Sequence, residues 1–543
     1  MRKWAAILLC YGLAATACTR QQGVHESVIG RHTWTIPHVL RYADITDVTT
    51  LNPHLSTATA TQWIGRLTAA WLIRWDRHND PVPELVLQVP TKADGGVSKD
   101  GLTITYHLRK GVRWSDGAPF TADDVVFSTR VVLNPANNET GRAGWDRIRS
   151  IQEPDSYTVV FKLSKPYSPF VETFFSTAGG NPCILPKHLL AQYPTINSVA
   201  YNSKPIGIGP FVVDHWERGS RVVMKANPLY WRGRPRLDEI IYTIAPDRNT
   251  IVNELQTHEI DLWPLLGGAY EAQVQQIPGI VVHRRPSYGW NHLDFNMARP
   301  ALSDLAVRLA LRYAVDRNQI RQKIGHGFGL ISDSPTPASA PYAATVPITP
   351  FDIAKANLTL DRAGWKRAPD GVRAKDRRRL ELTLFSVAGS PDIDNVVELL
   401  RANWNKIGVS LSYKKVPAAL MFAPGPQGGV LNGTNWDIAF FGWSNDAIGD
   451  YSGLYGCESF PPNGQNDPRW CDRKAESAMQ ALYADYDQSK RTADVASFVK
   501  QFVADAPVIV EMQREDISAY NSDLQNFTPG SLTMFDDMMH IDI

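Results

Sequence analysis

The second half of the chain alternates strand-like and helix-like segments, and this pattern restricts the fold more than any other feature. The apolar run "LELTLFSV" (380–387) leads into Ser390-Pro391, a helix cap followed by proline at the first helical position. After that helix, "VSLSYKKV" (409–416) and "DIAFFGW" (437–443) have the composition of strands. Strand, helix and strand with short connections form a βαβ unit. The sequence therefore predicts an α/β lobe after about residue 290.

The first part of the chain has a different pattern, which is rich in strands. "LTITYHLR" (102–109) alternates apolar and polar residues, as a half-buried strand does. Thr121 and Asp124 then form a capping-box pattern at the start of a helix. Because 543 residues exceed the size at which one hydrophobic core stops growing, we expect at least two lobes.

One long helix is predicted near residue 310, and its apolar spacing suggests which side is buried. In "SDLAVRLALRYAVDRNQI" (303–320), Leu305, Leu309 and Tyr313 share one helical face, with alanines alongside. This spacing is typical of an amphipathic helix.

The charge balance argues against a nucleic-acid-binding protein. The chain has 56 basic and 55 acidic residues, a formal charge of +1, and no long basic stripe. The densest basic cluster, "KDRRR" (375–379), lies beside a strand-like segment, where basic side chains commonly protect exposed strand edges.

The N-terminus has the plan of an export signal. "MRKWAAILLCYGLAATAC" (1–18) has a basic start and an apolar run too short to span a bilayer, and small residues precede Cys18. Its end resembles the lipobox of bacterial lipoproteins, in which the cysteine is lipidated and becomes the mature N-terminus. Ala15 stands where leucine is commonest, so ordinary cleavage that leaves a free Cys18 remains the alternative. No later segment has the length and apolar character of a membrane span.

Export would place the remaining cysteines in an oxidising compartment. Cys457 and Cys471 lie in one loop-rich segment, "CESFPPNGQNDPRWC", and we expect them to form a disulfide. Metal ligation is the alternative, but no CxxC motif or histidine cluster lies nearby. Cys183 is then a lone, buried thiol.

Two carboxylates follow the predicted strand at 437–443, among several aromatic residues. In open α/β sheets, ligands collect at the carboxyl ends of strands, so Asp446 and Asp450 favour a binding role over an incidental acidic loop. A glycosidase-like acid/base pair is an alternative, although such acids usually come from different strands. The chain has no GxSxG, HExxH, P-loop or CxxC motif, and the spacing is poor for Ca²⁺. We therefore expect no enzyme, no metal and no cofactor.

Several longer blocks point to one family. They are "PELVLQ" (83–88), "DGLTITYHLRKGVRWSDGAPFTADDVVFS" (100–128), "PIGIGPF" (205–211), "ANPLYWRGRPRLDEI" (226–240), "NHLDFN" (291–296) and "VRLALRYAVDRNQI" (307–320). In these blocks the chain resembles the family 5 extracellular solute-binding proteins, the dipeptide- and oligopeptide-binding lipoproteins of bacterial ABC importers. The likeness runs from about residue 45 to residue 527.

The resemblance implies an α/β fold of the periplasmic-binding-protein type, class II, with three lobes and a ligand cleft between two α/β lobes. After the signal peptide at 1–18, lobe I would combine 30–80, 205–285 and 505–543. Lobe II would be the insertion at 81–204, and lobe III would be 286–504. Two chain crossings, near 284–288 and 503–508, would form the hinge.

The resemblance also implies a function and a site. The protein would be a monomeric, extracytoplasmic, lipid-anchored receptor that captures peptides and delivers them to an ABC importer permease. Asp446, aligned on the Gly-Trp pair at the end of the strand, would receive the peptide α-ammonium, with Trp443, Asp450 and Tyr451 beside it. Cys457 and Cys471 match the cysteines of dipeptide-binding members. Other members carry nickel chelates, sugars, haem or opines, and a secreted hydrolase that uses Asp446 and Asp450 is a further alternative.

Overall fold

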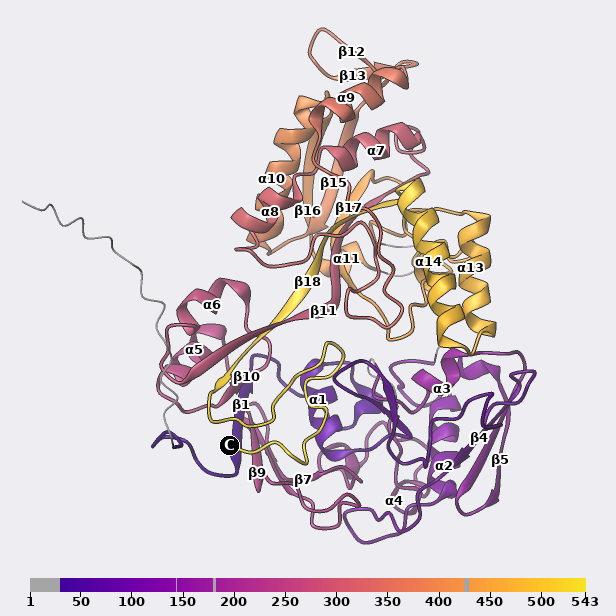
Figure 1. Cartoon of the computed structure of the whole chain (residues 1–543), viewed down its shortest axis with the longest axis vertical. Coiled ribbons are helices and arrows are strands. Elements are labelled where there is room, and N and C mark those ends of the chain that lie inside the picture. Colours follow the sequence, from indigo (N-terminus) through magenta and orange to yellow (C-terminus); the bar gives the residue numbers. More distant parts are fainter. Residues whose placement is uncertain (1–29, 143, 179–181, 424–428) are drawn as a thin grey trace, which may run out of the picture.

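A ten-stranded mixed sheet joins the two ends of the molecule in the computed structural model, which describes residues 30–142, 144–178, 182–423 and 429–543 (Figure 1). Its strands, in spatial order, are β16 (Ser410–Val416), β15 (Glu381–Val387), β17 (Ile438–Ser444), β11 (Ile280–Phe295), β18 (Val508–Asn521), β10 (Leu262–Trp263), β1 (Val39–Asp44), β9 (Glu239–Ile244), β8 (Arg221–Ala226) and β7 (Phe211–Glu217). Helices and smaller sheets cover the two ends separately. The predicted α/β fold is confirmed, and the structure adds that it is built on one large mixed sheet.

Lobe I is built on the β10-to-β7 end of this sheet. Its helices are α1 (Thr59–Thr68), α5 (Arg248–Gln256) and α6 (Gly268–Val274). Apolar side chains of the strands, of α1 and of the last twenty residues of the chain share one core. The N-terminal and C-terminal segments of the described chain are therefore held in the same lobe.

Lobe II is a separate layer around a three-stranded antiparallel sheet in the order β4–β6–β5. It comprises β3 (Pro81–Pro83), β4 (Thr103–His107), α2 (Ala122–Leu133), β5 (Ile148–Asp155), β6 (Thr158–Leu163), α3 (Pro169–Thr173) and α4 (Lys187–Leu190). Strand β2 (Ile73–Trp75) pairs with β3 and packs in the same core, although the predicted boundary put residues 30–80 in lobe I. The predicted strand at 102–109 is confirmed as β4. The predicted cap is confirmed too, because the Asp124 carboxylate accepts the Thr121 N–H at 3.0 Å at the start of α2.

Lobe III is the α/β layer that was predicted after residue 290. Its helices are α7 (Leu305–Tyr313), α8 (Arg317–Lys323), α9 (Ile353–Arg362), α10 (Pro391–Lys406), α11 (Ala418–Met421), α12 (Ser452–Tyr455), α13 (Arg473–Ala484) and α14 (Gln488–Asp505). Strand β15, helix α10 and strand β16 form the predicted βαβ unit, with β15 and β16 parallel. Ser390 caps α10, since its hydroxyl accepts the Ile393 N–H.

The predicted helix at 303–320 differs from the structure in two respects. It is interrupted between α7 and α8, and the side of α7 that is most deeply buried is not the one formed by Leu305, Leu309 and Tyr313. Leu305 is 39% exposed, whereas Val307 and Leu311 are fully buried. Arg308 is also buried, because its guanidinium donates to the carbonyl oxygens of Leu302 and Asp505, each at 2.7 Å. An arginine saturated by carbonyl oxygens is compatible with the packed side of a helix.

Strands β11 and β18 connect lobe I to lobe III as one long antiparallel pair. Ile280 pairs with Asn521 at the lobe I end, and Asp294 pairs with Val508 at the lobe III end. The first predicted crossing, 284–288, lies in the middle of β11. The second lies in the middle of β18, opposite that point, rather than at 503–508, which belongs to the end of α14 and the start of β18. The exact lobe boundaries stay a prediction.

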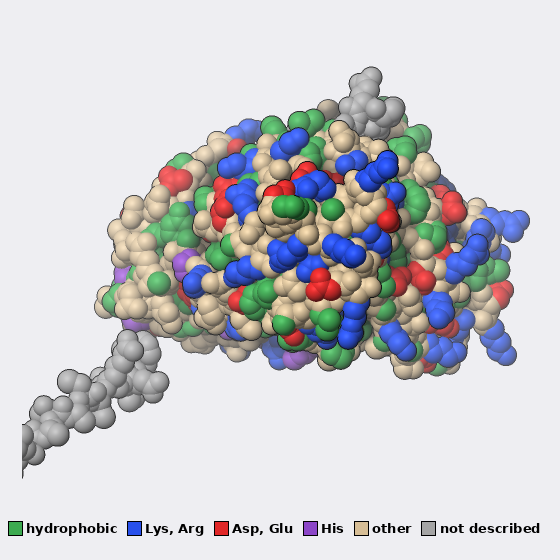
Figure 2. Space-filling model, turned by 90° about the horizontal axis from the view of Figure 1, so that it is seen from above, with side chains coloured by type: hydrophobic (Ala, Val, Ile, Leu, Met, Phe, Trp, Pro, Cys, Tyr) green, Lys and Arg blue, Asp and Glu red, His purple; other side chains and the backbone are tan. Residues whose placement is uncertain are grey.

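The basic cluster at 375–379 forms a small hairpin instead of guarding the main sheet. Strands β12 (Lys366–Arg367), β13 (Arg373–Lys375) and β14 (Arg378–Arg379) make a separate three-stranded sheet at the far end of lobe III (Figure 1). Figure 2 looks onto this end and shows Lys and Arg side chains interspersed with Asp and Glu. In the described part of the chain, no helix has the length and hydropathy to cross a membrane.

Candidate functional site

Asp446 lies just beyond the C-terminal end of β17, in a tight loop that its own side chain organises. Its Oδ1 accepts the backbone N–H groups of Ile448, Gly449 and Asp450 at 3.0, 2.6 and 3.1 Å. The hydroxyl of Tyr342 donates to the Asp446 carbonyl at 2.5 Å. One carboxylate oxygen is thus fixed by three amides, which orients the other oxygen for a further donor.

The electrostatic surroundings of Asp446 suit a cationic ligand group. The residue is exposed, yet protein atoms crowd its carboxylate, and this desolvation raises its pKa to about 7. The nearby Asp450 carboxylate raises the pKa further, whereas the three amide N–H groups lower it. A cation that binds beside this carboxylate stabilises it, because an opposite charge in a partly desolvated site favours the ionised form.

Asp450 has protein partners of its own. Its Oδ2 accepts the hydroxyl of Tyr483 at 2.8 Å, and its Oδ1 accepts the Ser452 N–H at 2.9 Å. Tyr483 belongs to α13, so this carboxylate ties the loop to the helical hairpin. Asp450 therefore supports the position of Asp446 in the described structure.

The two aromatic candidates lie in different environments. Tyr451 is 2% exposed and its ring stacks on Phe498 of α14, with 4.8 Å between the ring centroids. Trp443 is half-buried at the end of β17, with its ring near that of Phe441. Trp443 therefore keeps part of its side chain accessible, whereas Tyr451 packs in the core, where burial above all, and then the Asp446 charge, raises the pKa of its phenol.

Strand β17 has an open backbone edge next to Asp446. Its pairing with β15 covers only Ile438 to Phe440, whereas its pairing with β11 continues to Ser444. Among the described strands, none pairs with the other side of residues 441–444. An unpaired strand edge is a template for an extended peptide.

The site faces lobe II across a cavity of about 340 Å³. Residues that line it include Trp75, Val171, Glu172, Pro341, Ala447 and Arg491. The lobes touch around it. The Ser168 N–H donates to the Tyr483 carbonyl at 2.8 Å, and Arg491 donates to the Glu172 carboxylate at 2.7 Å. Ala447 follows Asp446 directly, so this space adjoins the carboxylate.

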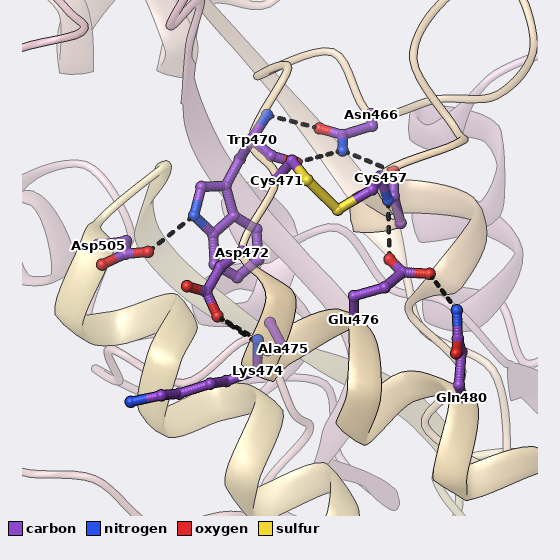
Figure 3. Close-up of a disulfide and its surroundings, with 11 residues drawn as sticks. Cys457, Asn466, Trp470, Cys471, Asp472, Lys474, Ala475, Glu476, Gln480 and Asp505 are labelled. Carbon is purple, nitrogen blue, oxygen red and sulfur yellow. Dashed lines mark hydrogen bonds between the residues drawn. A yellow bond between two sulfur atoms is a disulfide. The ribbon is translucent and has the colours of Figure 1, made fainter.

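The disulfide between Cys457 and Cys471 secures the loop that follows the site, with 4.8 Å between the Cα atoms (Figure 3). The Cys457 N–H donates to Glu476 of α13 at 2.8 Å. Trp470 is anchored too, because its indole N–H donates to Asp505 of α14 at 3.0 Å. The predicted pairing is confirmed, and Cys183 is a buried free thiol.

Replacing both Cys457 and Cys471 by alanine should lower the free energy of unfolding by about 3 kcal/mol, because the open chain gains loop entropy when it unfolds. Urea unfolding of the purified protein, followed by tryptophan fluorescence, measures the change. Adding a reductant should destabilise the wild type but not the double variant. Equal stability of the two proteins under oxidising conditions would contradict this prediction.

Several residues at the site were not predicted from the sequence. Tyr342 and Tyr483 position the loop, and Arg514 of β18 donates to the Trp443 carbonyl at 3.3 Å. They come from segments far from Asp446 along the chain, and no motif identifies them. Within the described residues, no three His, Cys, Asp or Glu side chains lie close enough to hold a metal ion. Cys18 lies outside the described residues.

Comparisons with known proteins agree with this architecture. Residues 65–465 match the family model of the bacterial extracellular solute-binding proteins, family 5 Middle. Protein XP55 of Streptomyces lividans is 34% identical over 321 residues, which cover 59% of this chain and 56% of that protein. The oligopeptide-binding protein AppA of Bacillus subtilis is 26% identical over 472 residues, which cover 85% of this chain and 84% of that protein.

A solved structure shows the same fold. AppA from Bacillus subtilis, in complex with a nonapeptide, superposes with a TM-score of 0.72 at 22% identity, covering 93% of this chain and 98% of that one. The family model spans well over half of the chain, and the fold likeness extends over nearly all of it. The chain therefore belongs to the bacterial extracellular solute-binding proteins of family 5.

Proposed function

We propose that this protein binds peptides in the cleft between lobes II and III, with the peptide α-ammonium on Asp446. The geometry of Asp446 carries this proposal. One of its oxygens is held by three backbone amides, and the other, which no described residue donates to, can accept a charge-assisted hydrogen bond. The open edge of β17 at residues 441–444 then offers backbone pairing to an extended peptide.

Pairing through the backbone explains how such a receptor can accept many sequences. Main-chain hydrogen bonds supply affinity without reading side chains, and a charged clamp fixes where the peptide begins. The β11–β18 pair is the connection about which the lobes would close, because both strands cross between them. The relatives named as peptide-binding proteins support this ligand class.

We propose further that the protein acts as a monomer outside the cytoplasm, without catalysis, and passes its cargo to the permease of an ABC importer. The basic and apolar segment before Cys18 supports export, and lipidation of that cysteine would tether lobe I to the membrane. Mass spectrometry of the mature N-terminus distinguishes a diacylated Cys18 from a free one.

N-acetylation of a peptide should weaken its binding at least tenfold, because acetylation removes the positive charge that Asp446 meets. Calorimetry compares tri-alanine with N-acetyl-tri-alanine. N-methyl-tri-alanine keeps the charge and should bind within a few-fold of the parent. If free and acetylated peptides bind equally, the ligand is of another class. Turnover of a peptide or oligosaccharide that Asp446→Asn abolishes would favour the hydrolase alternative.

A further inference from the structure

Glu511 is a buried carboxylate that the peptide clamp does not use. On β18, Met512 pairs with Asn291 and Val510 pairs with His292, so Glu511 is the extra residue of a β-bulge. Its side chain is only 3% exposed. Bulges re-aim side chains and are frequent beside binding sites. Here the bulge directs the Glu511 side chain into the interior of lobe III.

The carboxylate of Glu511 lines a cavity of about 200 Å³ with largely apolar walls. The wall residues come from α8, α10, β17 and β18, and they include Ile320, Ile324, Ile393, Val396, Phe440 and Met512. Such a space accommodates an aliphatic stem, with the carboxylate as its charged end. This combination fits a side chain that is apolar along its length and cationic at its tip.

Glu511 has no ion-pair partner among the described residues. Its hydrogen bond is to Asn291, and burial raises its pKa to about 7. The positive charge of Arg317 lowers the pKa of Glu511 somewhat, but its guanidinium donates to Asp333 at 2.5 Å and to the Ser332 carbonyl at 2.8 Å instead of to Glu511. A desolvated carboxylate of this kind is stabilised by a cation that brings its own charge.

The other charged groups of the cavity lie nearer to solvent. They are Arg321, Asp392, Arg514 and Glu515, and their formal charges sum to zero. Arg321 donates to the Gly327 carbonyl at 3.1 Å, and Glu515 accepts the Gly329 N–H at 2.8 Å. The net charge that remains is that of Glu511, at the buried end.

The cavity adjoins the open edge of β17. Phe440 lines it, and a Cβ at Gly442 would lie 3.1 Å from Oδ1 of Asn291, another lining residue. Arg514, at its mouth, reaches the carbonyl of Trp443, three residues before Asp446. That separation is about 10 Å of extended chain, or roughly three residues of a paired peptide. A peptide that starts at Asp446 would therefore direct its second, third or fourth side chain toward this cavity.

We infer that the cavity at Glu511 is a subsite for a basic side chain, lysine or arginine, of the bound peptide. This inference rests on the proposed peptide-binding function and adds a preference to it. The methylene groups contact the apolar walls, and the cation pairs with Glu511. The receptor thus favours peptides with a basic residue close behind the amino terminus.

The test compares tetra-alanine peptides that carry lysine or norleucine at position 2, 3 or 4, by calorimetry. Norleucine keeps the aliphatic stem and lacks the charge. At one of these positions lysine should bind at least tenfold more tightly than norleucine. Glu511→Gln should reduce that preference below twofold and leave the affinity for tetra-alanine unchanged. The inference is wrong if no position prefers lysine, or if Glu511→Gln retains the preference.

Two further variants test whether the effect is specific to Glu511 and to this cavity. Glu84→Gln is the matched control. Glu84 is also buried, and burial raises its pKa to about 7, but it lies in lobe II. This variant should therefore keep the preference for lysine. Ile393→Phe narrows the cavity. It should weaken the binding of the lysine peptide and of the norleucine peptide equally at the preferred position, and leave the affinity for tetra-alanine unchanged. Undiminished binding of the long side chains to Ile393→Phe would place them elsewhere.

The two proposals fail in different ways. If tetra-alanine binds and needs its free amino group, but no lysine preference depends on Glu511, only the subsite is refuted. If no peptide binds, both proposals are refuted. Thermal unfolding of each variant shows whether its fold is retained.

Discussion

Asp446→Asn should weaken the binding of a free-amino peptide about a hundredfold while the protein stays folded. Asparagine keeps an Oδ1 that can accept the amides of Ile448, Gly449 and Asp450, so the loop geometry is retained. The second oxygen becomes an NH₂ group, which cannot accept from the ligand ammonium. Loss of one partner of a desolvated charge pair typically costs about 2–5 kcal/mol, and a hundredfold change corresponds to about 2.7 kcal/mol.

Calorimetry with tri-alanine measures this effect, and Asp450→Asn is the matched control. The Asp450 Oδ1 accepts the Ser452 N–H, which an asparagine oxygen can also accept. The NH₂ group that replaces Oδ2 can donate to the Tyr483 hydroxyl, which has the Ser452 hydroxyl as a second partner. We therefore expect less than a threefold change for the control. Unchanged affinity in Asp446→Asn, or equal losses in both variants, would rule out the assigned role of Asp446.

The second large effect is the pH dependence of peptide affinity. Burial and Asp450 raise the pKa of Asp446 to about 7 in the ligand-free protein, and only the ionised carboxylate pairs with an ammonium. Affinity should therefore fall by a factor that approaches ten for each pH unit below 7, and be about fiftyfold weaker at pH 5 than at pH 7. Above about pH 8 the peptide amine loses its proton, and affinity falls again.

Calorimetry in buffers of different ionisation enthalpy checks the origin of this profile. Between pH 5 and 6 the wild type should release close to one proton for each peptide bound. Asp446→Asn should show neither the release nor the slope. A flat affinity between pH 5 and 7 would show that Asp446 is already ionised in the free protein.

The same titration has a consequence for folding. Because the folded-state pKa of Asp446 is raised above its unfolded value, its contribution to stability is fully present below about pH 4 and is lost as pH rises through 7. Bound peptide reverses this trend by stabilising the ionised form. Wild type and Asp446→Asn should therefore differ in the pH dependence of unfolding, and the difference should shrink with saturating peptide.

Local sequence patterns predicted much of the fold. The capping pair Thr121 and Asp124, the Ser390 cap and the strand at 102–109 depend on contacts within a few residues, which the sequence displays directly. The Cys457–Cys471 pairing is also local, since one short loop joins the two residues. Asp446 could be identified as a candidate because the end of a buried strand is recognisable from composition.

Sequence patterns did not predict the burial of residues whose environment is set by tertiary contacts. The buried side of α7 contains Arg308, because carbonyl oxygens of Leu302 and Asp505 satisfy its guanidinium, and apolar spacing cannot reveal such a partner. Tyr451 follows the site in the chain but packs on Phe498, a contact set by the position of α14. Periodicity cannot anticipate such partners, because they come from other elements.

By itself, then, the sequence determined the family-like blocks, the alternation of strands and helices, and the acid at the end of β17, and it predicted an export signal. These features depend on residues that are close along the chain. The tertiary structure alone decided that β17 keeps an open edge, that Asp450 is held by Tyr483, and that a bulge buries Glu511 in a cavity. Each of those outcomes depends on how strands and helices that are remote in sequence pack together, and that packing is what gives each carboxylate its environment.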